Sequence, residues 1–276
     1  MADKQPLVPT RAGHVTVEAG SRQIYWEYFG EGQKEVVVLL NGLAMLTRSW
    51  YRTVPLLHPE YDVLLYDYFG QGESSQEDEP YYISKLADYL IRIMDEVGVE
   101  KIHPIGVSYG GFIAADLGRL HQDRLHTLTL SGILLTRETN FQMYQDLSLR
   151  FYREPEPAFD LYTHYLYEKI FGEEFATRIY GPAMESGREK FYDRYKDRKY
   201  CLVRLTEAQN PFFKNIDDDS DAYRNIKTPT LILTGEHDRA IPPWQQEKLL
   251  SIIPNSRQII LPGSGHMTYM ERPDIF

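Results

Sequence analysis

The chain has 276 residues, enough for one large domain or for one domain with an inserted subdomain. Its 40 acidic and 30 basic residues give a net charge of -10, which repels phosphate backbones, so we expect no nucleic-acid partner. No apolar run is long enough for a membrane span, and no signal-peptide pattern is present. The single cysteine, Cys201, excludes an internal disulfide and suits a reducing compartment. We therefore predict a cytoplasmic protein.

Strand-like runs open the chain. Residues 14–18 and 23–29 partly alternate apolar and polar side chains, which is typical of a half-exposed antiparallel edge. Residues 35–40 and 61–67 are more continuously apolar, as in strands that are buried on both faces. Between residues 80 and 97 the apolar residues recur at helical spacing.

The alternation of strand and helix continues along the chain. A helix is predicted at residues 112–117, and further strands are predicted at residues 101–107, 125–130, 229–234 and 256–261. Strands that alternate with helices predict an α/β fold, with a mostly parallel sheet covered by helices on both faces.

The alternation of strands and helices is interrupted at residues 136–223. They contain no β-branched strand run, and helical spacing is present at residues 141–153, 158–171 and 188–210. We therefore predict a helical cap over the C-terminal edge of the sheet, inserted into a core domain of residues 1–135 and 224–276. The cap is rich in tyrosine, which suits either a pocket wall or packing against the core, because tyrosine combines apolar area with a polar tip.

The sequence Gly106-Val107-Ser108-Tyr109-Gly110 stands between a predicted strand and a predicted helix. A serine is a poor nucleophile unless it is exposed, fixed and paired with a base. A sharp strand-to-helix turn presents the serine side chain above the sheet, and the two glycines let the backbone pass without clashes. The alternative is a glycine-rich helix start with an incidental serine. The strand before the motif and the helix after it favour Ser108 as a nucleophile.

A serine nucleophile needs a base and a group that orients the base. Asp238 and His266 each follow a predicted strand late in the chain. Loops at the C-terminal edge of one parallel sheet converge, so Ser108, Asp238 and His266 are predicted to form a catalytic triad. His237 and Glu236 are the alternatives for the base and the acid.

Ester chemistry also needs N–H donors for the oxyanion. The turn aims the N–H of Tyr109 at a reacting carbonyl oxygen, and the N–H of Leu43, after a buried strand, is the second candidate. We assign Asn41 and Gly42 to substrate binding, and the alternative is an ordinary Asn-Gly turn. The sequence has no cysteine cluster and no helical His-x-x-His pair, so no catalytic metal site is predicted.

Taken together, these motifs resemble the α/β-hydrolase superfamily over most of the chain outside the cap. The resemblance rests on Leu40-Asn41-Gly42, residues 67–74, the Ser108 turn, residues 235–238, and Gly265-His266 followed by Glu271-Arg272-Pro273. It implies an eight-stranded sheet whose second strand is antiparallel, and a cap between the sixth and seventh strands. It also implies esterase-like chemistry without a cofactor.

Asn41-Gly42 departs from the His-Gly of many superfamily members. Residues 41–45, Asn-Gly-Leu-Ala-Met, are similar to the subgroup of rhamnolipid-precursor acyltransferases, which join 3-hydroxyacyl chains. This likeness keeps acyl transfer open beside hydrolysis. A resemblance to the dehalogenase or epoxide-hydrolase branches would require an aspartate in place of Ser108.

The sequence thus predicts a serine hydrolase that cleaves small-molecule carboxylic esters or thioesters through an acyl-enzyme. The alternative is an acyltransferase that passes the acyl group to a hydroxyl acceptor, because the same residues serve both reactions. A third hypothesis is a non-catalytic binding relative, since a fold alone does not establish function. The presence of Ser108, Asp238 and His266 together favours catalysis. The sequence leaves the oligomeric state open.

Overall fold

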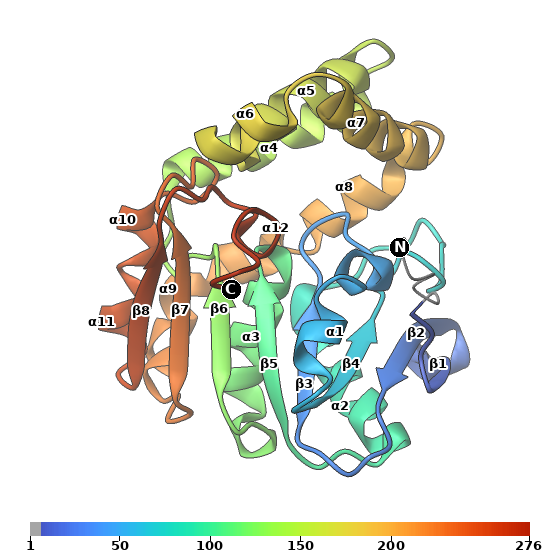
Figure 1. The fold of residues 1–276 in the computed structure, drawn as a ribbon, viewed down its shortest axis with the longest axis vertical. Coiled ribbons are helices and arrows are strands. Elements are labelled where there is room, and N and C mark those ends of the chain that lie inside the picture. The colour runs from blue at the N-terminus through green and yellow to red at the C-terminus, as the bar shows by residue number, and fades with distance from the viewer. Residues whose placement is uncertain (1–6) are drawn as a thin grey trace.

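The computed structural model describes residues 7–276, apart from the side chains of residue 19 and residues 217–220. Within these residues, eight strands form one sheet in the order β1-β2-β4-β3-β5-β6-β7-β8 (Figure 1). They are β1 (Arg11–Val17), β2 (Arg22–Phe29), β3 (Val36–Leu40), β4 (Asp62–Tyr66), β5 (Ile102–Val107), β6 (Leu128–Ser131), β7 (Thr230–Gly235) and β8 (Ser256–Leu261). The α/β fold class is confirmed, and each predicted strand is present with its ends moved by no more than three residues.

Strand direction divides the sheet into two parts. β2 pairs antiparallel with both β1 and β4, as the resemblance implied for the second strand. The strands from β4 across to β8 pair in parallel. Parallel neighbours need crossover connections, which the intervening helices supply. The C-terminal ends of β3 to β8 therefore lie along one edge of the sheet, the upper edge in Figure 1.

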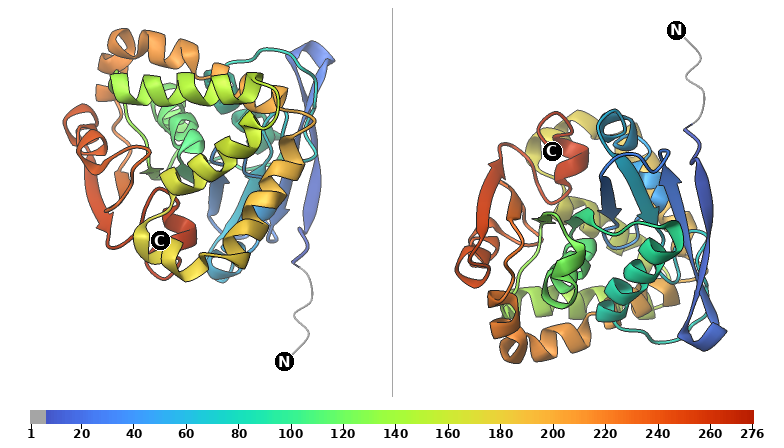
Figure 2. Two further views of the ribbon diagram at one scale, coloured as in Figure 1. Left: turned by 90° about the horizontal axis from the view of Figure 1, so that it is seen from above. Right: turned by 90° about the horizontal axis from the view of Figure 1, so that it is seen from below.

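Helices pack on both faces of the sheet and across its C-terminal edge. They are α1 (Val54–Leu57), α2 (Ile83–Val97), α3 (Tyr109–Leu120), α4 (Thr139–Arg153), α5 (Ala158–Ile170), α6 (Glu173–Ile179), α7 (Pro182–Tyr195), α8 (Tyr200–Glu207), α9 (Asn210–Arg224), α10 (Pro243–Gln246), α11 (Leu249–Ile252) and α12 (Thr268–Glu271). Seen from above in Figure 2, α4 to α7 lie across the end of the sheet. Among the described residues, no helix is both long and apolar enough to cross a bilayer.

Both faces of the central strands are buried. Successive residues of β3 enter different apolar clusters, with Val38 in one and Leu39 in the other. The first cluster contains the buried side chains of α2 and α3, and the second contains Trp50 and Tyr269. Two-sided burial explains why β3 is a continuous apolar run rather than an alternating one.

The segment between β6 and β7 occupies the position that the resemblance implied for a cap. Its division from the core at residues 136 and 223 stays a prediction. Within it, α4 packs against α5 and α8, and α5 packs against α7. α9 instead packs against α3 and α11, and the rings of Phe212 and Phe213 lie 5.3 and 5.2 Å from the ring of Phe112. We therefore propose that α9 belongs with the core.

The prediction of one continuous helix over residues 188–210 is wrong. α7 ends at Tyr195 and α8 begins at Tyr200. The guanidinium of Arg198 donates to the Gln76 side-chain oxygen at 2.8 Å, and the hydroxyl of Tyr200 donates to the Gln76 carbonyl at 2.9 Å. These bonds to a distant segment hold the chain in a turn where the apolar spacing alone favours a helix.

β5 passes into α3 at a tight turn that contains Ser108. Ser108 has φ 49° and ψ −117°, a strained conformation for a residue with a side chain. A Cβ on Gly110 would lie 2.3 Å from the carbonyl oxygen of Leu40, and a Cβ on Gly106 would lie 2.3 Å from that of Gly110. Glycine at these positions therefore lets the first turn of α3 approach the end of β3.

The variant Gly110→Ala tests this close approach. In an unobstructed helix, alanine is more favourable than glycine by about 1 kcal/mol. Here the clash with the Leu40 backbone should outweigh this preference for alanine. The free energy of unfolding of the variant, measured by urea denaturation, should therefore fall by about 1–3 kcal/mol. Gly118→Ala on the same helix is the control, because its Cβ would meet the flexible ends of Leu128 and Ile226. A more stable Gly110→Ala protein would contradict this account.

Candidate active site

A cavity of about 330 Å³ lies between the C-terminal edge of the sheet and the helices that connect β6 to β7. Residues of the loops after β3, β5, β7 and β8 line one side of the cavity, and residues of α4, α5, α7 and α8 line the other. Most of the lining is aromatic or aliphatic, and Ser108 and His266 are among its few polar residues. A mainly apolar cavity with a few convergent polar groups is the usual form of a small-molecule site.

Ser108 is fixed at the cavity by its own backbone. Its N–H donates to the carbonyl of Ser131 at the end of β6 at 2.8 Å, and its carbonyl accepts the N–H of Gly111 at 2.8 Å. Its side chain is partly exposed and lines the cavity. The turn therefore anchors Ser108 between β6 and the first turn of α3, with its side chain at the cavity wall.

The structure joins Asp238 and His266 by a hydrogen bond. His266 Nδ1 lies 2.8 Å from Asp238 Oδ2, and both side chains are buried. The other carboxylate oxygen, Oδ1, accepts the backbone N–H groups of Ala240 and Ile241 at 2.9 and 2.8 Å. Because His266 also lines the cavity with Ser108, the three predicted triad residues lie at one site, although they are far apart in sequence.

Two opposing effects act on the pKa of His266. Burial lowers it by penalising the imidazolium, but the carboxylate of Asp238, assisted by that of Glu271, raises it. The net effect raises the pKa of His266 above its ordinary value of about 6.5. An imidazole with these neighbours binds a proton readily and stabilises it as imidazolium.

Gly132 and Gln246 fix the position of the His266–Asp238 pair. Gly132 has φ 63°, and a Cβ there would lie 2.9 Å from His266 Cε1. Its N–H donates to Gln246 Oε1 at 3.2 Å, and Gln246 Nε2 donates to Asp238 Oδ2 at 3.1 Å. Sequence reasoning missed both residues, because neither stands in a motif that predicts contact with a distant histidine.

The two predicted oxyanion donors belong to residues that line the same cavity as Ser108. Leu43 and Tyr109 both line the cavity, and so does Gly42. Within residues 7–276, neither the N–H of Leu43 nor that of Tyr109 donates to another protein group. Tyr109 begins α3, where backbone N–H groups lack partners in the helix and the helix dipole favours negative charge.

Asn41, which the sequence assigns to substrate binding, lies behind the cavity wall. It is fully buried and is absent from the cavity lining. Its amide donates to the carbonyl of Tyr66 at 3.0 Å, and its Oδ1 accepts the indole N–H of Trp50 at 2.8 Å. These bonds position the turn that carries Gly42 and Leu43, so the physical role of Asn41 is to hold the loop.

The alternative residues for acid and base are directed away from the cavity. The side chains of His237 and Glu236 are 50% and 51% exposed, and neither lines the cavity. Glu236 accepts the backbone N–H of Gly263 at 2.9 Å. The structure therefore brings together His266 and Asp238 rather than these neighbours.

Glu271 is a positioning residue that sequence reasoning did not identify. Its buried carboxylate accepts three backbone N–H groups, those of Gly172 and Gly265 at 2.9 Å and that of Met267 at 3.1 Å. The N–H of His266 itself donates to the carbonyl of Ile170 at 2.8 Å. Hydrogen bonds from both residues thus connect the loop that carries His266 to the turn between α5 and α6. The Glu-Arg-Pro motif was the available signal, but one of the partners of Glu271, Gly172, lies 99 residues away in the sequence.

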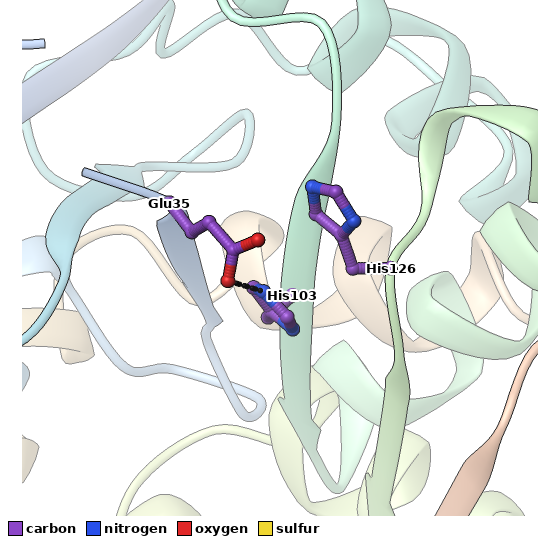
Figure 3. A group of neighbouring side chains, drawn as sticks. All are labelled: Glu35, His103 and His126. Carbon is purple, nitrogen blue, oxygen red and sulfur yellow. Dashed lines mark hydrogen bonds and ion pairs between the residues drawn. The ribbon is translucent and has the colours of Figure 1, made fainter. Parts of the chain in front are cut away.

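Glu35, His103 and His126 form a separate cluster of potential metal ligands (Figure 3). Its three ligand atoms lie within 4.8 Å of one another, at the opposite edge of the sheet from the cavity. Both ring nitrogens of His103 have partners, Thr127 at 2.9 Å and Glu35 at 3.1 Å. The two imidazoles are stacked at 24°, so their in-plane lone pairs do not converge on one point. This arrangement fits surface hydrogen bonding better than a preformed metal centre.

Comparisons with known proteins agree with this architecture. A family model described as alpha/beta hydrolase fold matches residues 35–273. A protein of Pseudomonas syringae pv. syringae (strain B728a), provisionally named as the carbamate hydrolase RutD, is 26% identical over 243 residues, which cover 86% of this chain and 88% of that protein. The 2-hydroxy-6-oxo-6-(2'-aminophenyl)hexa-2,4-dienoic acid hydrolase of Metapseudomonas resinovorans is 25% identical over 267 residues, covering 94% and 87%.

A solved structure is similar over nearly the whole chain. MGS-M2, an alpha/beta hydrolase enzyme from a Medee basin deep-sea metagenome library, aligns with a TM-score of 0.84 at 25% identity. The alignment covers 96% of this chain and 94% of that one. The likeness therefore includes the helices between β6 and β7 as well as the sheet.

The variant Glu271→Gln tests the fastening of the His266 loop. An amide offers one acceptor to three N–H donors, so the free energy of unfolding should fall by about 1–3 kcal/mol in urea. The imidazole pKa of His266, followed by NMR titration, should also fall, because the Glu271 charge raises it. Glu236→Gln is the control, since that half-exposed carboxylate accepts a single N–H. If both variants changed the free energy of unfolding and the pKa of His266 equally, Glu271 would not be the residue that positions the His266 loop.

Proposed function

The chain belongs to the alpha/beta hydrolase fold family, and we propose that it is a serine hydrolase that cleaves carboxylic esters or thioesters through an acyl-enzyme. The observation that carries the proposal is the hydrogen bond between Asp238 and His266 at a cavity that Ser108 also lines. The relatives are named for carbamate and dienoic acid hydrolysis, so their names agree on hydrolysis and differ on the substrate. A serine nucleophile that forms an acyl-enzyme is compatible with ester and thioester substrates.

In the proposed reaction, Ser108 Oγ attacks the carbonyl carbon of the substrate. His266 Nε2 takes the hydroxyl proton as the bond forms, and Nδ1–H remains donated to Asp238 Oδ2. When the tetrahedral intermediate collapses, His266 returns the proton to the leaving alcohol or thiol. The carboxylate of Asp238, held by the N–H groups of Ala240 and Ile241, stabilises the imidazolium.

The oxyanion of the intermediate would be held by the N–H groups of Tyr109 and Leu43. Among the described residues, neither N–H group has a protein acceptor, which supports this role because a preorganised donor does not have to break another bond first. The N-terminal end of α3 adds a favourable dipole at the same place.

Water completes the proposed cycle. His266 removes a proton from a water molecule, the resulting hydroxide attacks the acyl-Ser108 ester, and the released Ser108 oxygen recovers the proton. A hydroxyl acceptor in place of water would give acyl transfer with the same residues. Product analysis with and without 3-hydroxyacyl acceptors separates the two outcomes.

Activity should depend on pH through His266. The base must be neutral to accept the serine proton, so kcat/KM should rise with pH as the imidazolium ionises. Because the pKa of His266 is raised, the midpoint should lie above 6.5. His237→Gln is the control, and it should leave the midpoint unchanged. A midpoint that moves in His237→Gln would mean that the base has been misassigned.

The direct test of the proposed chemistry is a panel of 4-nitrophenyl esters and acyl thioesters. Wild-type protein should turn over members of the panel, and Ser108→Ala should lose on the order of 10⁶ in kcat while it remains folded. Asp238→Asn should lose on the order of 10⁴, because the imidazole then loses its orienting partner. Turnover that persists in Ser108→Ala would overturn the nucleophile assignment.

A further inference from the structure

The charged side chains of the cavity are all of one sign. Apart from His266, they are Lys190 and Arg194, and among the described residues no aspartate or glutamate lines the cavity. The chain as a whole has 40 acidic and 30 basic residues, so the cavity reverses the net charge of the protein. Fixed charges next to apolar walls act more strongly than charges in open water.

Both basic residues lie on one face of α7. Gly187, Lys190, Phe191 and Arg194 all line the cavity, and their spacing of three and four residues places them on a single side of the helix. Two cations four residues apart on a helix repel each other. A bound anion would remove that repulsion.

Two of the three acidic residues on α7 are paired with other cations, and the third, Glu189, is exposed. Glu185 accepts from Arg188 at 2.9 Å, and Asp193 accepts from Lys196 at 2.8 Å. In the described part of the chain, neither Lys190 nor Arg194 forms an ion pair. Within the described residues, their charges are therefore not matched by a direct ion pair.

Arg194 also lies beside the loop that carries Leu43. Its Nη1 donates to the carbonyl of Ala44 at 3.4 Å, and the hydroxyl of Tyr195 donates to the same carbonyl at 3.3 Å. Burial raises the pKa of Tyr167, a cavity residue on α5, and the charge of Arg194 opposes that rise. Arg194 thus lines the cavity and contacts the loop that follows β3.

We propose that Lys190 and Arg194 form a subsite for a carboxylate group, so that the substrate is an ester or thioester that carries a carboxylate on its acyl or its alcohol part. This proposal rests on the hydrolase function proposed above. Arginine suits the role because its planar guanidinium can donate two parallel hydrogen bonds to a carboxylate. Lys190, which is exposed, adds a second positive charge at the same face of α7.

The kinetic test compares matched esters that differ in charge. The acyl pair is mono-4-nitrophenyl glutarate and 4-nitrophenyl pentanoate, and the alcohol pair is 3-carboxyphenyl butyrate and phenyl butyrate. Wild-type protein should prefer the anionic member of one pair, and Arg194→Gln should reduce that preference about 10- to 100-fold, mainly through KM. Lys190→Gln should act in the same direction, and it removes no contact with the core. Lys196→Gln, an equal change in net charge on an ion-paired residue of the same segment, is the control and should leave the preference unchanged.

A binding measurement separates this proposal from the proposed function. Glutarate should raise the Tm of wild-type and Ser108→Ala protein, and it should not raise the Tm of Arg194→Gln. Glutarate binding that depends on Arg194, without turnover of any ester, would support the subsite and overturn the hydrolase proposal. Ester turnover with no anionic preference and no Arg194-dependent binding would overturn the subsite and leave the hydrolase proposal intact. Absence of both turnover and glutarate binding would overturn both.

Discussion

The close approach of α3 to the end of β3 is the contact on which the rest of the site depends. Gly110 packs against the carbonyl of Leu40, and this brings the loop of Gly42 and Leu43 beside Ser108. The strained backbone of Ser108 is held in turn by the Ser131 carbonyl at the end of β6. The next residue, Gly132, lies against the imidazole of His266. Backbone contacts across three neighbouring strands therefore place Ser108, the loop of Gly42 and Leu43, and His266 around one cavity.

The helices between β6 and β7 are attached to this centre from two sides. On one side, Ile170 and Gly172 bond to the His266 loop, directly and through Glu271. On the other side, Arg194 and Tyr195 of α7 bond to the carbonyl of Ala44. The same segment supplies most of the aromatic residues that line the cavity. A substitution that moves these helices should thus affect the orientation of His266 and of the loop of Gly42 and Leu43, which are proposed as the base and the oxyanion loop, as well as the shape of the cavity.

Local patterns were enough to predict the strands and to select Ser108, Asp238 and His266. The reason is physical: buried parallel strands need continuous apolar runs, and a nucleophile at a tight turn needs glycine two residues before and after it. The pattern could not show that Asn41 faces the core, because that depends on Trp50 and Tyr66 as partners. Nor could helical spacing reveal the break between α7 and α8, which is held by bonds to Gln76. The cationic face of α7 was visible in the spacing of Lys190 and Arg194, but its meaning depends on which way the helix faces.

The most direct test of the central claim is covalent labelling with a fluorophosphonate probe, with the site of modification located by peptide mass spectrometry. The account predicts one adduct, at Ser108, whose formation is slowed in His266→Ala because the serine then lacks its base. The probe requires no knowledge of the natural substrate, so the result does not depend on the choice of ester. An unlabelled protein, or labelling that falls on Cys201 or another residue and is unaffected by His266→Ala, would contradict the account.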